Sequence, residues 1–188
     1  MPTCAITPPN SYSMTPYTGI WSKELAAHLL RRTTLGPTQA QIDLVLTEGV
    51  DLSVENILQG FIPSDEPITW HSDETVAVQG ETWVDKFMTA DPLLEDQTNR
   101  ARQMSLYSWT SGRMNKQQAS APNIIEKMIF FWQNHFGVEQ AQDERLNYDY
   151  FRTLEAGAIG NFRMIVENIT INGAMMQLLD TASNTKWN

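Results

Sequence analysis

The chain of 188 residues lacks several sequence features that would indicate a class of function, among them paired cysteines, long apolar runs and a signal peptide. It contains a single cysteine, Cys4, so no disulfide can form within the chain. No stretch approaches the roughly 18 consecutive apolar residues of a membrane-spanning helix. The first residues, MPTCAITPPNSYS, lack the basic start and apolar core of a signal peptide. We therefore predict no membrane span and see no signal peptide, and these features leave the localisation unknown.

Positive charge is also scarce. Thirteen Lys and Arg residues stand against twenty-two Asp and Glu residues, which gives a formal net charge of -9. The largest run of basic residues is the pair Arg31 and Arg32. Because a phosphate backbone is bound by concentrated positive charge, we expect no nucleic-acid partner.

Signals for β-structure are missing as well: the chain shows no sustained two-residue alternation, no hairpin turn between strands and no repeat of fixed period. The sequence instead contains residues typical of helix starts and ends. Thr38 and Gln41 have the spacing of a capping box, and Asp91 before Pro92 is typical of a helix start. We expect helices at about 22–35, 38–48, 51–59, 81–88, 91–114, 120–136, 146–158, 161–169 and 172–179.

The predicted fold is all-α, an irregular multi-helix bundle around a central apolar helix at about 122–136. An extended, proline-rich arm at 1–20 precedes a single helical domain at 21–188. Within that domain we expect an N-terminal helical unit at 21–60, a long loop at 61–80 and the main bundle at 81–188. The helix 122–136 is placed at the centre because it is apolar over most of its circumference.

One histidine lies in the most apolar part of this helix, where the sequence reads FFWQNHF. An imidazole buried beside Phe131, Trp132 and Phe136 must find a hydrogen-bond partner, a metal or water. His135 is therefore either a core histidine bonded to a carbonyl or an asparagine, or a general base or single metal ligand. In the second case carboxylates such as Asp180 or Glu155 would complete the site from other helices.

Four blocks of sequence carry a resemblance to a known family. They are AAHLLRRTTLGPT at 26–38, EKMIFFWQNHF at 126–136, AIGNFR at 158–163 and GAMMQLLD at 173–180. Together they resemble the N-terminal half of the bacterial family called domain of unknown function 1800. The resemblance implies a helical protein of bacterial origin, often exported and usually part of a longer chain. It implies no established reaction and no known cofactor.

The sequence departs from that family in three places where a site could lie. Gln133 replaces the first histidine of a Trp-His-Asn-His-Phe pattern, which removes half of any His-x-His metal site. Glu155 stands where the family tends to have arginine, and Asn172-Gly173 stands where it tends to have Asp-Pro. Asn161 and Arg163, which flank Phe162, are interpreted as a helix cap and an ion-pairing arginine with structural roles.

Two functions remain open from sequence. The first is an interaction or assembly module that docks on a partner chain or on a C-terminal half of the same polypeptide. The second is part of a hydrolytic or metal-assisted enzyme whose site includes His135, with Asp180 and Glu155 as candidate catalytic residues. For the first function we predict that Met176, Leu179 and Trp187 bind the partner. They belong to an apolar helix face near the end of the sequence, and we expect this face to be exposed unless another segment or chain covers it.

Overall fold

The computed structural model describes residues 16–59, 65–119, 121–139 and 141–181, and within these ranges it contains eight helices and no strand. The single β-bridge in the described residues pairs Ile68 with Thr82. The predicted all-α class is therefore confirmed. Most of the predicted arm, residues 1–15, lies outside the described residues, and residues 16–22 contain no helix.

The N-terminal helical unit consists of α1 (Lys23–Thr33), α2 (Gln39–Glu48) and α3 (Val50–Gln59). The capping box predicted at Thr38 and Gln41 is present, with both reciprocal hydrogen bonds. Gly49 ends α2 with φ 82°, a conformation that favours glycine. The helices share a small apolar core of Ala26, Leu30, Val45 and Ile57.

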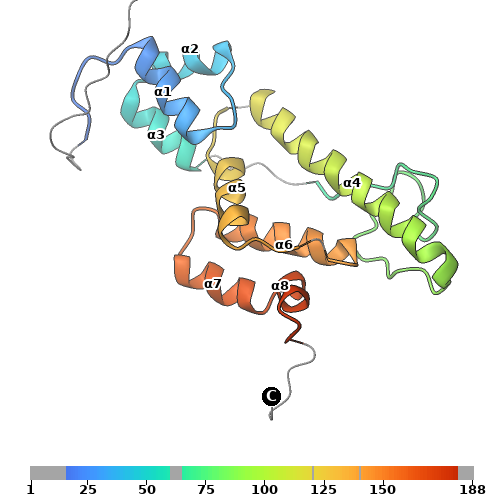
Figure 1. Ribbon diagram of the computed structural model, residues 1–188. Helices are drawn as coiled ribbons and strands as arrows, with labels where there is room; N and C mark the ends of the chain where they lie inside the picture. The colour runs from blue at the N-terminus through green and yellow to red at the C-terminus, as the bar shows by residue number, and fades with distance from the viewer. Residues whose placement is uncertain (1–15, 60–64, 120, 140, 182–188) are drawn as a thin grey trace, which may run out of the picture.

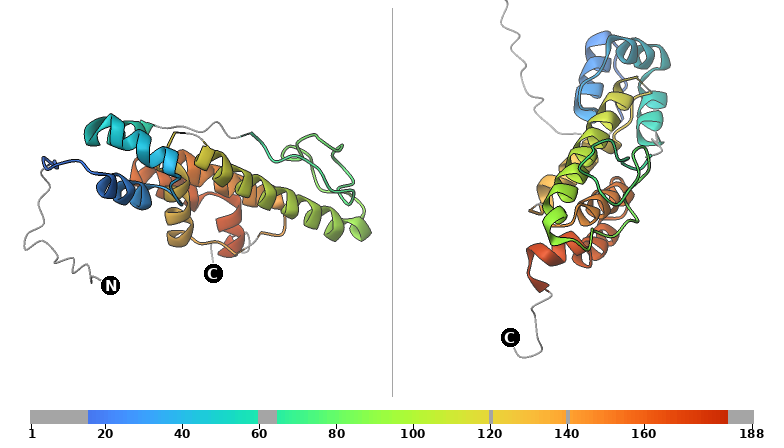
Figure 2. Two further views of the ribbon diagram at one scale, coloured as in Figure 1. Left: turned by 90° about the horizontal axis from the view of Figure 1, so that it is seen from above. Right: turned by 90° about the vertical axis from the view of Figure 1, so that its right-hand side faces the viewer.

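The long helix α4 (Pro92–Ala119) begins as the sequence predicts, with the Asp91 carboxylate accepting from the backbone N–H of Leu93 at 3.0 Å. Its buried side is unusually polar. The buried residues along it recur at three- and four-residue spacing and are Thr98, Ala101, Arg102, Ser105, Leu106 and Arg113. The N-terminal unit lies at one end of α4, and the segment 65–91 wraps around the other (Figure 1 and Figure 2).

The prediction of a helix at 81–88 is wrong, because the chain there forms turns, one β-bridge residue and irregular backbone. Trp83 is fully buried, and its indole N–H donates to Ser105 Oγ at 2.8 Å. The guanidinium of Arg102 donates to the carbonyl oxygens of Lys86 and Phe87. These carbonyls would accept from the chain itself in a helix, so the contacts with α4 replace the helical hydrogen bonds.

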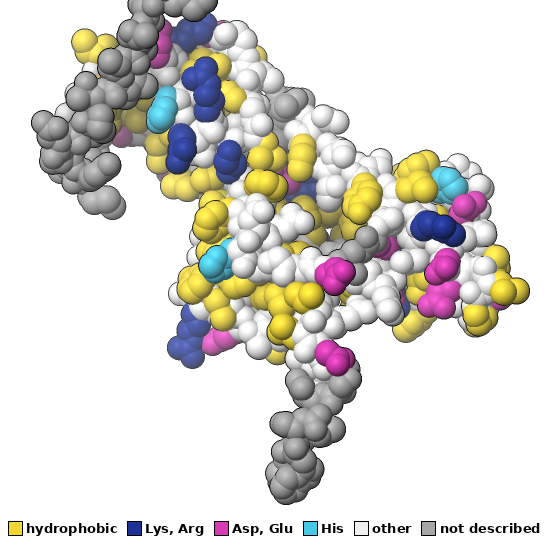
Figure 3. Space-filling model, in the orientation of Figure 1, with side chains coloured by type: hydrophobic (Ala, Val, Ile, Leu, Met, Phe, Trp, Pro, Cys, Tyr) yellow, Lys and Arg dark blue, Asp and Glu magenta, His cyan; other side chains and the backbone are white. Residues whose placement is uncertain are grey.

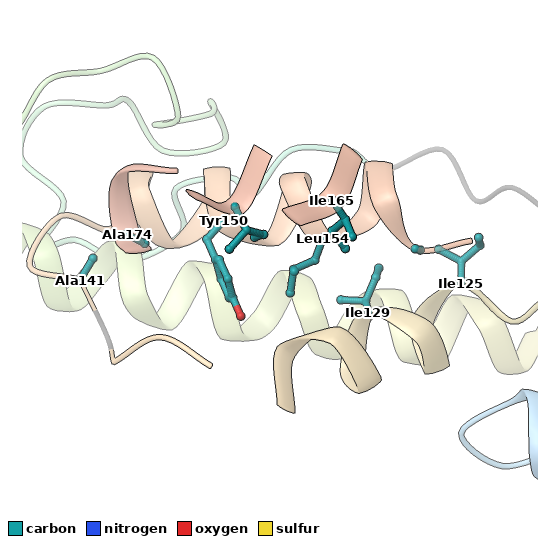
Figure 4. Packing of buried hydrophobic residues seen from close by; sticks show 9 residues of the cluster. Ile125, Ile129, Ala141, Tyr150, Leu154, Ile165 and Ala174 are labelled. Carbon is teal, nitrogen blue, oxygen red and sulfur yellow. The ribbon is translucent and has the colours of Figure 1, made fainter. Parts of the chain in front are cut away.

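The remaining helices are α5 (Ile125–His135), α6 (Glu144–Gly157), α7 (Phe162–Thr170) and α8 (Gly173–Leu178). Helix α6 packs against α4, α5, α7 and α8. The largest apolar core lies where these helices meet, around Leu154 and Ile165 (Figure 4).

The central helix is therefore α6, and the expectation that the helix at 122–136 is central needs correction. Helix α5 packs on α6 and α4, and its buried residues, Ile125, Glu126 and Ile129, lie in its first two turns. Beyond them Phe130 and Phe131 are 53% and 52% exposed. Apolar residues are often exposed in folded proteins. The apolar residues around most of α5 were therefore not enough to show that other helices surround it.

Hydrogen bonds from the start of α5 join the N-terminal unit to the rest of the chain. The N–H of Ile124 donates to the carbonyl of Ile57 at 3.2 Å, and the ammonium of Lys127 donates to the carbonyl of Thr34 at 3.3 Å.

Within the described residues, no helix has the length and apolar character needed to cross a bilayer.

Candidate functional site

His135 belongs to a group of aromatic rings at the end of α5 and the start of α7, which we call the aromatic surface. Its members are Phe131, Trp132, His135, Phe136 and Phe162. The imidazole stacks on Phe131 with ring centroids 6.4 Å apart and meets Phe136 edge to face at 4.7 Å. Phe162 reaches the group from α7, 5.7 Å from Trp132. Among the described residues, the contacts of His135 are with rings.

The backbone beneath the aromatic surface is held by hydrogen bonds. The indole N–H of Trp132 donates to the carbonyl of Ala158 at 2.9 Å, and the Tyr150 hydroxyl donates to the carbonyl of Phe136 at 3.1 Å. Three of the rings are open to solvent: Phe131 is 52% exposed, Phe162 is 55% exposed, and His135 is also exposed, whereas Trp132 and Phe136 are half-buried against the core. The histidine is therefore neither the buried core residue nor the enclosed base that the sequence suggested.

Further exposed apolar side chains lie on the same helices. Figure 3 shows hydrophobic side chains gathered over α5 and α7. Those exposed on α5, α7 and the turns around α7 are Phe130, Ile159, Met164 and Ile171. Exposed apolar side chains are thus frequent on α5 and α7, and where such side chains form a patch they often mark an interaction site.

Glu155 lies elsewhere, in a buried network of charges beneath α4. Its carboxylate accepts from Nη2 of Arg113 at 2.5 Å, and its second oxygen lies 2.5 Å from Nη1 of Arg152. Nη2 of Arg113 also donates to Glu126 at 2.5 Å, and Nε donates to the same oxygen at 2.9 Å. Two carboxylates therefore hold one buried guanidinium, and Glu155 is a structural ion-pair partner here.

The guanidinium of Arg113 also lies between two aromatic rings. Its Cζ is 5.0 Å from the ring centroid of Trp109 and 5.0 Å from that of Phe151, within the range of a cation–π contact. Sequence reasoning missed this residue. The available signal was its spacing on α4, eleven residues after Arg102 and close to three helical turns, which places both arginines on the helix side that carries Ser105 and Leu106.

The second buried ion pair joins α4 to the segment 65–91. Arg102 donates from Nε to Glu74 at 2.6 Å, and both side chains are almost fully buried. Burial raises the pKa of Glu74, but hydrogen bonds from Arg102 and from the backbone N–H groups of Ala77 and Val76 outweigh it. The net effect is a pKa below the ordinary value of 4.5.

The other predicted site residues occupy separate places. Asp180 follows α8 with φ 50°, and Met176 and Leu179 are 40% and 59% exposed. Trp187 lies outside the described residues. Asn161 caps α7 by accepting from the backbone N–H of Arg163, and that arginine pairs with Glu167 in an exposed contact at 2.8 Å.

The structure does not bring the predicted catalytic residues together. His135 meets aromatic rings, whereas the Glu155 carboxylate meets two arginines, and no hydrogen bond joins these two residues. Gln133 lines a cavity between α4 and α6, so the two positions of the His-x-His pattern face different surfaces. Among the described residues, no three His, Cys, Asp or Glu side chains form a group able to hold a metal ion.

Comparison with known proteins gives one match. The model of a family described as protein of unknown function (DUF1800) matches residues 28–188, which is most of the chain. No curated protein and no solved structure matches. The match agrees with the resemblance carried by the four sequence blocks.

Proposed function

This chain belongs to the DUF1800 family, whose function is unknown, and from that premise we propose that it is an interaction module that binds a partner protein through the aromatic surface. The observation that carries the proposal is the combination of exposed rings with a hydrogen-bonded backbone. Phe131 and Phe162 are more than half exposed, while the helix ends beneath them are tied by Trp132 and Tyr150.

Such a surface suits binding for energetic reasons. Phe, Tyr and Trp are enriched at protein interfaces, and a few of them commonly supply most of the binding free energy. A fixed backbone lowers the entropy that must be lost when the complex forms. Covering Phe131 and Phe162 would remove a large apolar area from water, and each ring side chain is worth about 1.5 to 3 kcal/mol when fully buried.

The partner we propose is a basic amphipathic helix of another protein chain. Helices commonly bind by placing an apolar face on a hydrophobic surface between helices, and α5 and α7 together offer such a surface. The net charge of -9 favours a partner of opposite sign, because complementary charge speeds association and disfavours acidic competitors. The exposed side chains Met176 and Leu179 of the α8 region are proposed as a second contact for the same partner.

The experiment uses two synthetic helical peptides with the same leucine face, one with lysine and one with glutamate on the polar face. Each peptide carries a fluorescent label, and its polarisation is measured as the protein is added. We expect the lysine peptide to bind more tightly, with an affinity that falls when Phe131 or Phe162 is replaced by serine. Each substitution should weaken binding by roughly tenfold or more, the usual effect at a hot spot.

Leu93→Ser is the matched control, since Leu93 is 88% exposed at the start of α4 and lies outside the aromatic surface. Its affinity for the lysine peptide should equal that of the natural chain. Equal binding by the three variants would contradict the proposal. Light scattering is run in parallel: a dimer that Phe131→Ser disperses would mean that a second copy covers the surface, and the proposal of a separate basic partner would then fail.

The enzyme hypothesis has less support in this geometry. It requires His135 to act with Glu155 or Asp180, and the Glu155 carboxylate is held by Arg113 and Arg152. Metal content measured on the natural chain and on His135→Ala would test it directly. A metal that is present in the first and lost from the second, with the fold unchanged, would restore the hypothesis.

A further inference from the structure

A cavity of about 300 Å³ lies between α4, α6, the end of α5 and the chain that follows α5, and among the described residues no member of the aromatic surface lines it. It has a mixed wall of aromatic rings, carboxylates and neutral polar groups. The residues that decide its chemistry are Tyr107, Glu139, Glu144, Tyr150 and Phe151. This size is at the lower end of pockets that hold small ligands.

The charge of the wall has one sign. Among the described residues that line the cavity, the ionisable side chains besides tyrosine are Glu139 and Glu144, with no Lys, Arg or His. Glu144 is only 1% exposed and lies in the first turn of α6, where the helix terminus favours a negative charge. Its carboxylate accepts from Asn147 Nδ2 at 3.0 Å, so the charge is held in place.

Three rings complete the wall. Tyr150 is 5% exposed and its hydroxyl is committed to the Phe136 carbonyl, so the side chain is fixed in the wall as a neutral ring. Burial raises the pKa of Tyr150 to about 12, which is consistent with that neutral state. Tyr107 is 58% exposed and lies near the opening. Phe151 already carries the Arg113 guanidinium at 5.0 Å from its centroid, and that charge is balanced by Glu126 and Glu155.

We propose that this cavity binds a small organic ammonium ion between Tyr107, Tyr150 and Phe151, with Glu139 and Glu144 supplying the opposite charge. Ring faces attract a cation through their quadrupoles, and a ligand cation held by several rings is a common form of ammonium recognition. Nearby carboxylates add direct attraction. An anion would meet two like charges and no basic side chain in the described wall. The site goes beyond the docking function, because its lining residues are not members of the aromatic surface.

The test is a calorimetric titration of the whole chain with choline chloride and, separately, with 3,3-dimethyl-1-butanol, a neutral molecule of nearly the same shape. We expect saturable binding of choline and binding of the alcohol that is weaker by roughly tenfold or more. Tyr107→Ala should weaken choline binding by roughly 2- to 30-fold, the range of a single ring contact. Glu139→Gln should also weaken it, and more at low salt than at high salt.

Both variants change exposed side chains, so each should fold, and circular dichroism checks this. Glu95→Gln is the matched control, because Glu95 is an exposed carboxylate on α4 that does not line the cavity. It should bind choline as the natural chain does. Three results would each overturn the proposal: no saturable binding of choline, equal binding of the alcohol, or affinity unchanged in both Tyr107→Ala and Glu139→Gln.

Discussion

The two sides of α6 are held by different kinds of contact. On the α7 and α8 side, Leu154, Ile165, Ile169 and Ala174 form an apolar core. On the α4 side the buried contacts include ion pairs, of which Arg113 with Glu126 and Glu155 is the largest group. Apolar contacts tolerate changes of partner, whereas a buried charge needs its particular partner in place. Helix α4 should therefore depend on a few residues more strongly than α7 and α8 do.

The largest effect is expected for Arg113→Ala. This substitution leaves Glu126 and Glu155 buried without the cation that bridges them, and the loss of one partner of a buried pair costs about 3 to 5 kcal/mol. The measurement is the free energy of unfolding in urea. Arg163→Ala removes an exposed ion pair as a control and should change stability by about 0.5 kcal/mol or less. Equal effects of the two substitutions would mean that the buried ion pairs of α4 contribute no more to stability than exposed ones.

Leu154→Ala tests the apolar side. Leu154 is fully buried in the core of α5, α6 and α7, so its truncation should cost about 2 to 5 kcal/mol through lost contacts and a cavity. Leu154→Met should cost much less than Leu154→Ala, because methionine is hydrophobic and has a similar volume, so it can fill the same space. A methionine variant as unstable as the alanine variant would show that this core also needs one particular residue.

Acid should weaken the α4 side through Glu74. Because its pKa is lowered in the folded state, Glu74 contributes stability above the unfolded value of about 4.5, and this contribution is lost as the pH falls through the folded value. Glu74→Gln should be less stable than the natural chain at pH 7 and should lose less stability between pH 7 and pH 3. The measurement is the urea midpoint across that range. Parallel curves would mean that Glu74 is not the responsible carboxylate.

The smallest effect is expected for Phe131→Ser. Phe131 is about half exposed, and surface substitutions away from caps and ion pairs usually change stability by about 0.5 kcal/mol. The unfolding midpoint should therefore stay close to that of the natural chain, even though binding of the lysine peptide is expected to weaken. A loss comparable to that of Leu154→Ala would mean that the ring supports the fold, and the aromatic surface would lose a member.

Local signals predicted much of this fold. The capping box of α2, the Asp91-Pro92 start of α4 and the asparagine cap of α7 each depend on neighbouring residues, so they can be recognised without the rest of the chain. The family was also recognisable, because its blocks are short runs of sequence.

The candidate site was less predictable, because it depends on contacts between distant segments. Arg113 and Glu155 are 42 positions apart, so no local pattern in the sequence links them. The aromatic run FFWQNHF indicated burial, but its exposure depends on where α6 and α7 end relative to α5. The segment 81–88 has helical spacing, but Trp83 and the carbonyl of Lys86 form hydrogen bonds to distant residues of α4 instead, which the local pattern does not reveal.

The attachment of the segment 65–91 to α4 has a consequence for proteolysis. Ser105 accepts from Trp83 and donates to the carbonyl of Ile68, and Arg102 binds Glu74 together with the carbonyls of Lys86 and Phe87. A protease must draw several residues of extended backbone into its cleft, so it would first have to break these buried contacts. Despite having no helix of its own, this segment should therefore be cut only as fast as these contacts open.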